Sequence, residues 1–175
     1  MAIEDEDTTL EWFGKCTLEE EPHVEEKADA VAGATTYRLK AKGLTIFLDT
    51  WLERPSIMPS YLKIADVTEA DYIFISHAHF DHLPGCDRLA KQTGATVIAN
   101  GEAINVLREV GVPEEQLLPV AGGERIPLFT RKAREAARRG ECALAPGPPG
   151  APALPDSSLA AMAVHAVSGE HERLQ

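Results

Sequence analysis

Three histidines and one aspartate lie within six residues of this chain, at His77, His79, Asp81 and His82. Imidazole nitrogens and carboxylate oxygens bind zinc at about 2 Å, and alternate residues on a tight loop can direct His77 and His79 at one ion. Asp81 and His82 are placed to face a second ion. Two ions about 3.5–4 Å apart can share a water, lower its pKa and present hydroxide to a carbonyl or phosphoryl centre. The cluster therefore predicts a metal centre that activates water.

A plainer interpretation is that these are surface histidines satisfied by water and backbone, which is the usual state of a single histidine on a loop. Four donors in six positions favour the metal centre instead. Asp81 is in addition a candidate catalytic residue, because its carboxylate can orient the attacking water. The cluster also follows an apolar run, and α/β folds build their sites at the carboxyl ends of strands.

The elements around the cluster alternate between strand and helix. The apolar run Tyr72–Ser76 predicts the strand that enters the cluster, and Leu44–Leu48 predicts a second strand. Tyr37–Lys40 is the hairpin partner expected across a turn at Gly43. Downstream, the pattern predicts a helix over 86–93, a strand over 95–99 and a helix over 102–110, with Gly94 and Gly111 ending the helices. This alternation indicates the α/β class.

The last third of the chain has a weaker pattern. Arg125–Phe129 predicts a strand after the Gly122-Gly123 turn, and Arg131–Arg139 predicts a basic helix. Residues 145–156 contain five prolines, which is typical of an extended linker. The basic helix suggests a nucleic-acid function, but such a run is more often a solvated helix face and it lies away from the histidines. We expect no nucleic-acid partner.

Composition places these elements in one ordinary domain with an acidic start. The chain has 175 residues, 44% of them hydrophobic, and a formal charge of -11, of which residues 1–30 carry -9. Cys16, Cys86 and Cys142 are too few and too scattered for a disulfide framework, which suits a reducing compartment. The start has no signal-peptide pattern and no stretch approaches a membrane span, so we expect a cytoplasmic protein.

The stretch from Gly43 to about Phe129 resembles the metallo-β-lactamase superfamily, in which a His-x-His-x-Asp-His motif supplies ligands to one or two metals, usually zinc. The resemblance implies an αββα sandwich, of which this chain supplies largely the N-terminal half. Asp49 matches the family aspartate that supports the metal loop from outside the ligand shell, although a simple turn residue at the strand end explains it equally well.

The run Leu48-Asp49-Thr50-Trp51-Leu52 is most similar to the branch with phospholipase-D-type and sugar-lactone hydrolases. The function implied is a metal-dependent hydrolase that acts on an ester, a lactone or a phosphodiester of a small-molecule or lipid-like substrate. Zinc is the metal expected, with manganese or iron as alternatives.

The resemblance also divides the chain. Residues 12–14 and 34–37 look like two halves of one N-terminal strand motif of the family, which makes residues 15–33 an insertion. The domains expected are an acidic leader with this insertion over 1–33, an αβ half-domain over 34–130, a basic helix with a Pro/Gly-rich linker over 131–158, and a terminal strand fragment over 159–175.

The family's later ligands are poorly matched. His171 is the candidate for the third histidine of the first metal, His165 is a weaker one, and the bridging aspartate and last histidine have no candidates. The chain then looks like a C-terminally truncated member, and the alternative function is a non-catalytic protein that at most binds metal or a partner. A half sandwich also leaves one sheet face uncovered, which predicts self-association.

Overall fold

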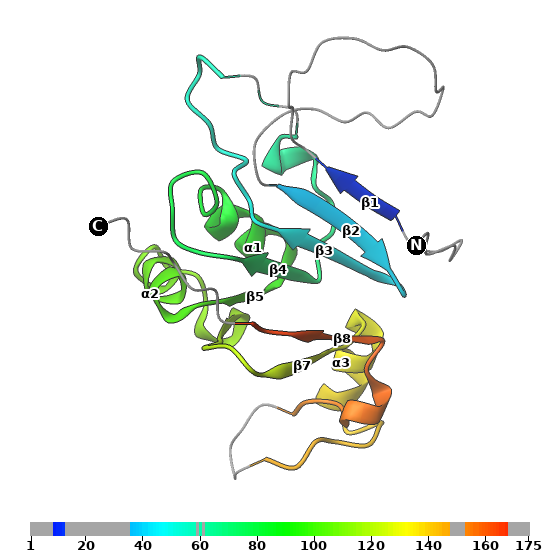
Figure 1. Ribbon diagram of the computed structural model, residues 1–175. Helices are drawn as coiled ribbons and strands as arrows, with labels where there is room; N and C mark the ends of the chain where they lie inside the picture. The colour runs from blue at the N-terminus through cyan, green and yellow to red at the C-terminus, as the bar shows by residue number, and fades with distance from the viewer. Residues whose placement is uncertain (1–8, 13–35, 59, 61, 148–152, 168–175) are drawn as a thin grey trace. The chain divides into compact units, whose positions relative to one another are not determined.

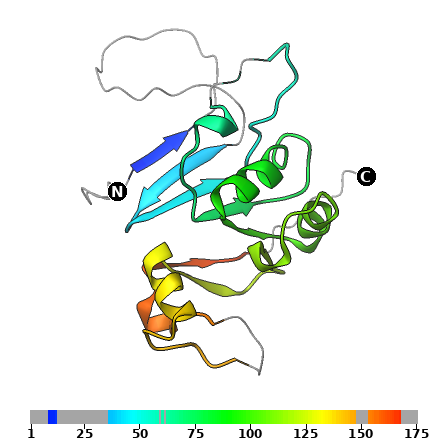
Figure 2. The same ribbon diagram turned by 180° about the vertical axis from the view of Figure 1, so that it is seen from behind.

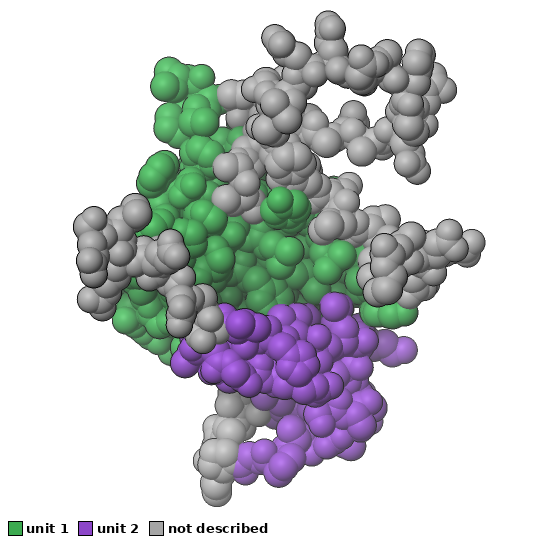
Figure 3. All heavy atoms as spheres, viewed as in Figure 1, with its two compact units in different colours: residues 1–119 green, residues 120–175 purple. Residues whose placement is uncertain are grey.

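The computed structural model describes residues 9–12, 36–58, 60, 62–147 and 153–167 (Figure 1). The chain divides into two compact units, residues 1–119 and residues 120–175 (Figure 3). Each unit contains β-sheet and helix, so the predicted α/β class is confirmed. The finer boundaries predicted after residues 33, 130 and 158 stay predictions. In the part of the chain that the structure describes, no helix is long and apolar enough to cross a membrane.

The first unit is built on one mixed sheet whose six strands follow their order in the sequence. The strands are β1 (Thr9–Trp12), β2 (Tyr37–Ala41), β3 (Leu44–Leu48), β4 (Tyr72–Ile75), β5 (Thr96–Ala99) and β6 (Leu117–Pro119). The pairs β1–β2 and β2–β3 are antiparallel, whereas β3–β4, β4–β5 and β5–β6 are parallel. The carboxyl ends of β3 and β4 therefore lie side by side, which brings Asp49 close to the histidine cluster.

The hairpin between β2 and β3 turns on Lys42 and Gly43. Both residues have positive φ, 51° and 74°, as a two-residue type I′ turn requires. The turn sets the register, with Ala41 opposite Leu44 and Leu39 opposite Ile46. The predicted hairpin is confirmed.

Two helices, α1 (Cys86–Thr93) and α2 (Gly101–Glu109), cover one face of the parallel strands (Figure 2). Phe47, Ile73 and Val97 are register partners on β3, β4 and β5 and have no exposed surface. Leu89 of α1 and Leu107 of α2 belong to the same buried cluster. Burial of each such side chain contributes about 1.5–3 kcal/mol, so this core fixes the strands whose ends carry the candidate site.

Helix α1 ends where the sequence predicts, whereas α2 lies one residue earlier than its predicted range of 102–110. α1 stops at Gly94, which adopts φ 72° and donates its backbone N–H to the carbonyl of Ala90. α2 begins after Asn100, whose side chain accepts a hydrogen bond from the N–H of Ala103. On the opposite face of the sheet Ile46, Tyr72 and Ile98 are buried as well. Short 3-10 turns, η1 (Ile64–Asp66) and η2 (Glu114–Gln116), complete the unit.

The second unit pairs β7 (Arg125–Leu128) with β8 (Met162–His165) in an antiparallel sheet. Helix α3 (Arg131–Arg138) begins after Thr130, whose hydroxyl accepts a hydrogen bond from the N–H of Ala133. The 3-10 turn η3 (Ser157–Leu159) precedes β8. Part of the predicted linker, residues 148–152, lies outside the described residues, and a bridge between Leu144 and Pro155 joins its two flanks.

Candidate metal centre

The loop that follows β4 carries the four residues predicted to bind metal. It leaves the strand at Ser76 and leads through His77–His82 to the start of α1. The backbone N–H groups of His82 and Leu83 both donate to the carbonyl of His79, at 3.1 Å each. This closes a tight turn, so side chains that are up to five residues apart in sequence share one small volume.

The three imidazoles of the loop lie in contact. The ring centroids of His77 and His79 are 4.3 Å apart, and those of His77 and His82 are 3.9 Å apart. The carboxylate of Asp81 lies 3.7 Å from Nε2 of His82. The structure therefore brings together all four residues that the sequence pattern singles out.

Asp49 anchors this loop from the end of β3. Its Oδ1 accepts hydrogen bonds from the backbone N–H and the hydroxyl of Ser76, at 2.8 and 3.1 Å. Its Oδ2 lies 2.9 Å from Nδ1 of His82. Because a carboxylate only accepts, Nδ1 of His82 is the donor in that contact, and Nε2 is the nitrogen through which the ring can bind a metal.

Asp49 makes these contacts from a left-handed backbone conformation, with φ 50°. Aspartate and asparagine tolerate this region better than most residues, and the turn aims the carboxylate across to β4. The sequence left two roles open for Asp49, a turn residue or a support of the metal loop. The structure shows that it makes the turn and holds His82.

Ser76 and Thr50 are two polar residues of the site that the sequence pattern did not single out. The hydroxyl of Ser76 lies 3.0 Å from Nδ1 of His77 and 3.2 Å from Nδ1 of His82. The backbone N–H of Thr50 donates to the carbonyl of His82 at 2.7 Å. Both residues adjoin a recognised motif residue in sequence, and that adjacency was the only signal.

Cys86 lies beneath the loop and contributes no thiolate. Its side chain is fully buried, and this burial raises the pKa of the thiol to about 12, although a hydrogen bond with Thr50 opposes the shift. At neutral pH the sulfur therefore keeps its proton and acts as an apolar core group. The candidate donors are the histidines and Asp81.

Aromatic side chains border the histidines. Phe80, inside the loop, is 78% exposed and meets Trp51 edge to face at a centroid distance of 6.3 Å. The guanidinium of Arg54 covers Trp51 at 4.7 Å. Because Trp51 is only 7% exposed, Phe80 is the ring of this pair that can contact the carbon part of a substrate.

The donor types fit a zinc ion, and the contact between Asp49 and His82 is the outer-shell contact that orients such ligands. Among the described residues, however, no group of three or more histidine, cysteine, aspartate or glutamate side chains has its donor atoms arranged to hold an ion. The imidazoles are gathered against one another and do not converge on a common point.

The later ligands find less support. His165 lies on β8 in the second unit with an exposed side chain. His171 lies outside the described residues.

Comparison with known proteins identifies relatives of this chain. The family model described as beta-lactamase superfamily domain matches residues 44–170. A UPF0173 metal-dependent hydrolase of Pyrobaculum islandicum is 30% identical over 114 residues, which cover 62% of this chain and 50% of the relative. A second one, from Rubrobacter xylanophilus, is 35% identical over 95 residues, 54% of this chain and 38% of the relative. The chain thus spans half or less of the length of these curated relatives.

Two solved structures align with part of this chain. One is a new diphosphatase from the PhnP family, at 21% identity and TM-score 0.43, covering 70% of this chain and 53% of that one. The other is the metallo-beta-lactamase SMB-1 in complex with mercaptoacetic acid, at 24% identity and TM-score 0.37, covering 54% of this chain and 46% of that one.

Proposed function

This chain belongs to the beta-lactamase superfamily. From that membership we propose that it is a metal-dependent hydrolase whose metal ligands are His77, His79, Asp81 and His82. One observation carries the proposal: three imidazoles lie in contact on one turn, and Asp49 holds the third through Nδ1. The relatives named metal-dependent hydrolases support the same activity.

Zinc is the metal we propose, in one or two ions, with manganese or iron as alternatives. His77 and His79 would hold one ion, and Asp81 with His82 a second. When bound, such a metal supplies a water of lowered pKa and polarises the substrate oxygen. The proposed reaction is hydrolysis of an ester, a lactone or a phosphodiester.

The chain's own residues have separate tasks in this proposal. Asp49 keeps the hydrogen of His82 on Nδ1 and fixes the ring. Asp81 orients the attacking water by accepting a hydrogen bond from it. Phe80, which is exposed and packs edge to face on the buried Trp51, contacts the apolar part of the substrate. A small or lipid-like molecule with an ester-type bond suits this surface.

His171 is our proposal for the third histidine of the first metal. The second candidate function is a non-catalytic protein that at most binds metal or a partner. The observation that favours it is that, in the described residues, the donors do not converge as three or more ligands. A partial set of ligands holds metal loosely. Measurements of bound metal and of turnover therefore distinguish the two functions.

Metal analysis of the purified full chain, beside His77→Ala and His79→Ala, tests the proposal. We expect bound zinc and chelator-sensitive hydrolysis of a generic phosphodiester or lactone in the unmodified chain, and loss of both in each variant. Lys132→Ala, at an exposed position on α3, is the control and should keep both. Zinc content that is the same in all four proteins contradicts the assignment. Metal without turnover supports the non-catalytic function.

We further propose a cytoplasmic protein that uses no nucleic acid and self-associates through its sheet. The free cysteines Cys86 and Cys142 support a reducing compartment, and the exposed Leu118 on the last strand of the sheet supports self-association. Light scattering that gives the mass of a single chain at high concentration would contradict self-association.

A further inference from the structure

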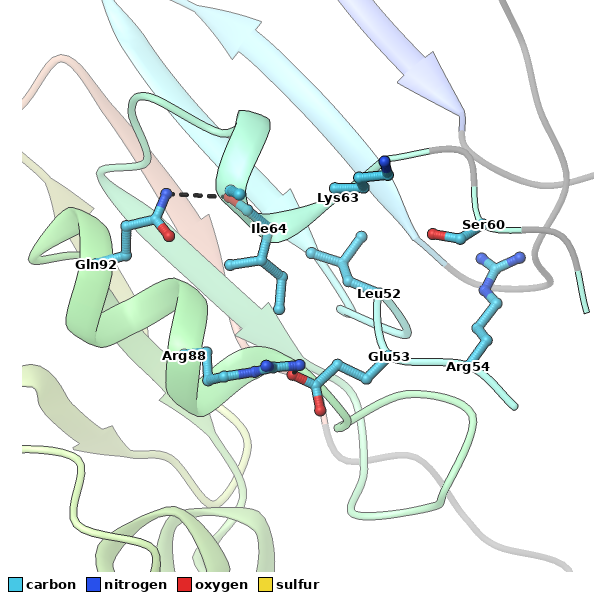
Figure 4. Close-up of a pocket in the computed structure, with 9 residues that line it drawn as sticks. Leu52, Glu53, Arg54, Ser60, Lys63, Ile64, Arg88 and Gln92 are labelled. Carbon is cyan, nitrogen blue, oxygen red and sulfur yellow. Dashed lines mark hydrogen bonds and ion pairs between the residues drawn. The ribbon is translucent and has the colours of Figure 1, made fainter. Parts of the chain in front are cut away.

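A pocket of about 620 Å³ opens in the first unit, beside the segment that follows Asp49 (Figure 4). Its volume is in the range of small-molecule sites. Leu52 and Ile64 give it an apolar wall, and charged side chains surround that wall: Glu53, Arg54, Lys63 and Arg88. These residues come from the loop after β3, from η1 with the residue before it, and from α1, so the pocket is assembled from three segments.

The charge of the lining is positive in an acidic chain. Arg54, Lys63 and Arg88 are cations and Glu53 is the single acid, which pairs with Arg88. The formal balance of the lining is +2, whereas the whole chain carries -11. Cations from different segments that line one pocket favour an anionic ligand. The ammonium of a lysine and the guanidinium of an arginine can each contact a different oxygen of that ligand.

The positions of two polar side chains are set by contacts. Nε of Arg54 donates to the carbonyl of Trp51 at 2.9 Å, and its guanidinium lies 4.7 Å from the Trp51 ring centroid. The amide nitrogen of Gln92 on α1 donates to the carbonyls of Ile64 and Val67, at 3.0 and 2.7 Å. The wall formed by η1 is thereby tied to α1, and less ordering is needed when a ligand enters.

The pocket also adjoins the chain that carries the histidines. The backbone N–H of Leu52 donates to the carbonyl of Pro84 at 3.1 Å. A Cβ atom placed on Gly85 would lie 3.1 Å from Ile64, 3.2 Å from Leu52 and 3.3 Å from Glu53. The end of the histidine loop therefore packs directly behind the pocket lining.

We propose that this pocket binds the phosphate group of a small organic phosphate, with the cations contacting the phosphate oxygens and Leu52 and Ile64 contacting the carbon portion. The lining combines a net positive charge with an apolar wall, which is the complement of such a molecule. Binding needs neither a bound metal nor turnover, so the inference stands or falls independently of the hydrolase proposal.

Calorimetric titration of the full chain, dialysed free of divalent metal in a chloride buffer, tests the inference with inorganic phosphate and hexyl phosphate as probes. We expect one saturable site per chain, tighter for hexyl phosphate, and weaker as sodium chloride is raised. Lys63→Gln should weaken the binding of both phosphates by about tenfold, because each phosphate loses one charge-assisted contact. Lys132→Gln, the same change at an exposed position on α3, is the control and should bind as the unmodified chain does.

Three outcomes would overturn the inference. They are the absence of saturable heat, an equal affinity in a folded Lys63→Gln variant, and loss of phosphate binding in His77→Ala, which would place the anion at the histidines. Thermal unfolding of each variant establishes that it is folded. Equal affinity for the two phosphates would overturn the role given to Leu52 and Ile64.

Discussion

At the scale of single residues, Asp49 shows how one side chain prepares a donor for a metal. Its carboxylate lies 2.9 Å from Nδ1 of His82 and also accepts from the N–H of Ser76. The parallel pairing of β3 and β4 and the fold of the histidine loop bring these three residues together. The sequence shows an aspartate at a strand end; its partners, 27 and 33 positions away, depend on the sheet register.

Replacement of Asp49 by alanine should therefore reduce metal affinity without removing a proposed ligand. Loss of an outer-shell partner of this kind costs about 10–100-fold in affinity. The dissociation constant for zinc, measured by chelator competition, checks the expectation, and thermal unfolding reports the accompanying loss of stability. Asp49→Asn is the matched variant, because asparagine also tolerates positive φ and retains one oxygen acceptor. It should keep more of the stability. An unchanged zinc affinity in Asp49→Ala would rule out the proposed support role.

At the scale of elements, the sequence predicted best where local signals and burial agree. β3 and α1 have the predicted bounds, because Leu44–Leu48 is a continuous apolar run and α1 ends at Gly94. β6 was not predicted: it has three residues, ends in Pro119 and has one buried side chain. Its existence depends on pairing with β5, which the local sequence does not encode. For the same reason the contacts of Ser76 and Thr50 could not be predicted.

The start of α1 depends on one glycine. Gly85 has φ 97°, and a Cβ atom there would lie within 3.1–3.3 Å of Ile64, Leu52 and Glu53. Gly85→Ala should lower the free energy of unfolding by about 1–3 kcal/mol, from backbone strain together with displacement of these neighbours. Urea unfolding measures the change.

Gly94→Ala isolates the backbone part of that effect. Gly94 also has positive φ, 72°, but nothing lies within 4 Å of its added Cβ. Its cost should be about 1 kcal/mol, the penalty for alanine in a left-handed conformation. If both variants lose the same stability, the packing of Gly85 against the pocket lining contributes nothing.

At the scale of the whole molecule, the described parts form two units, and the histidine loop with the strands that position it lies in the first. The sequence identified the α/β class and the order of its elements, because hydrophobic runs and glycine stops are local. The sequence did not specify the boundary between the two compact units, because that boundary depends on packing between distant segments. The predicted insertion, residues 15–33, lies outside the described residues, yet the strands on either side of it are described.

The register of those strands makes the insertion testable. Trp12 on β1 is the partner of Tyr37 on β2. Deletion of residues 15–33 would leave Phe13, Gly14 and residues 34–36 between them, which is a usual length for a hairpin connection. The entropic cost of closing a loop grows with its length. The deletion should therefore preserve the fold and add about 1.4 kcal/mol of stability. Urea unfolding and the zinc content of the deletion variant check both expectations.

A matched variant separates length from charge. Replacement of residues 15–33 by a Gly/Ser segment of equal length removes the acidic side chains and keeps the loop long. It should show no entropic gain, whereas the deletion should. If the deletion variant loses cooperative unfolding while the Gly/Ser variant keeps it, β1 and β2 need a long connection, and the family-type hairpin inferred for this end of the chain is wrong.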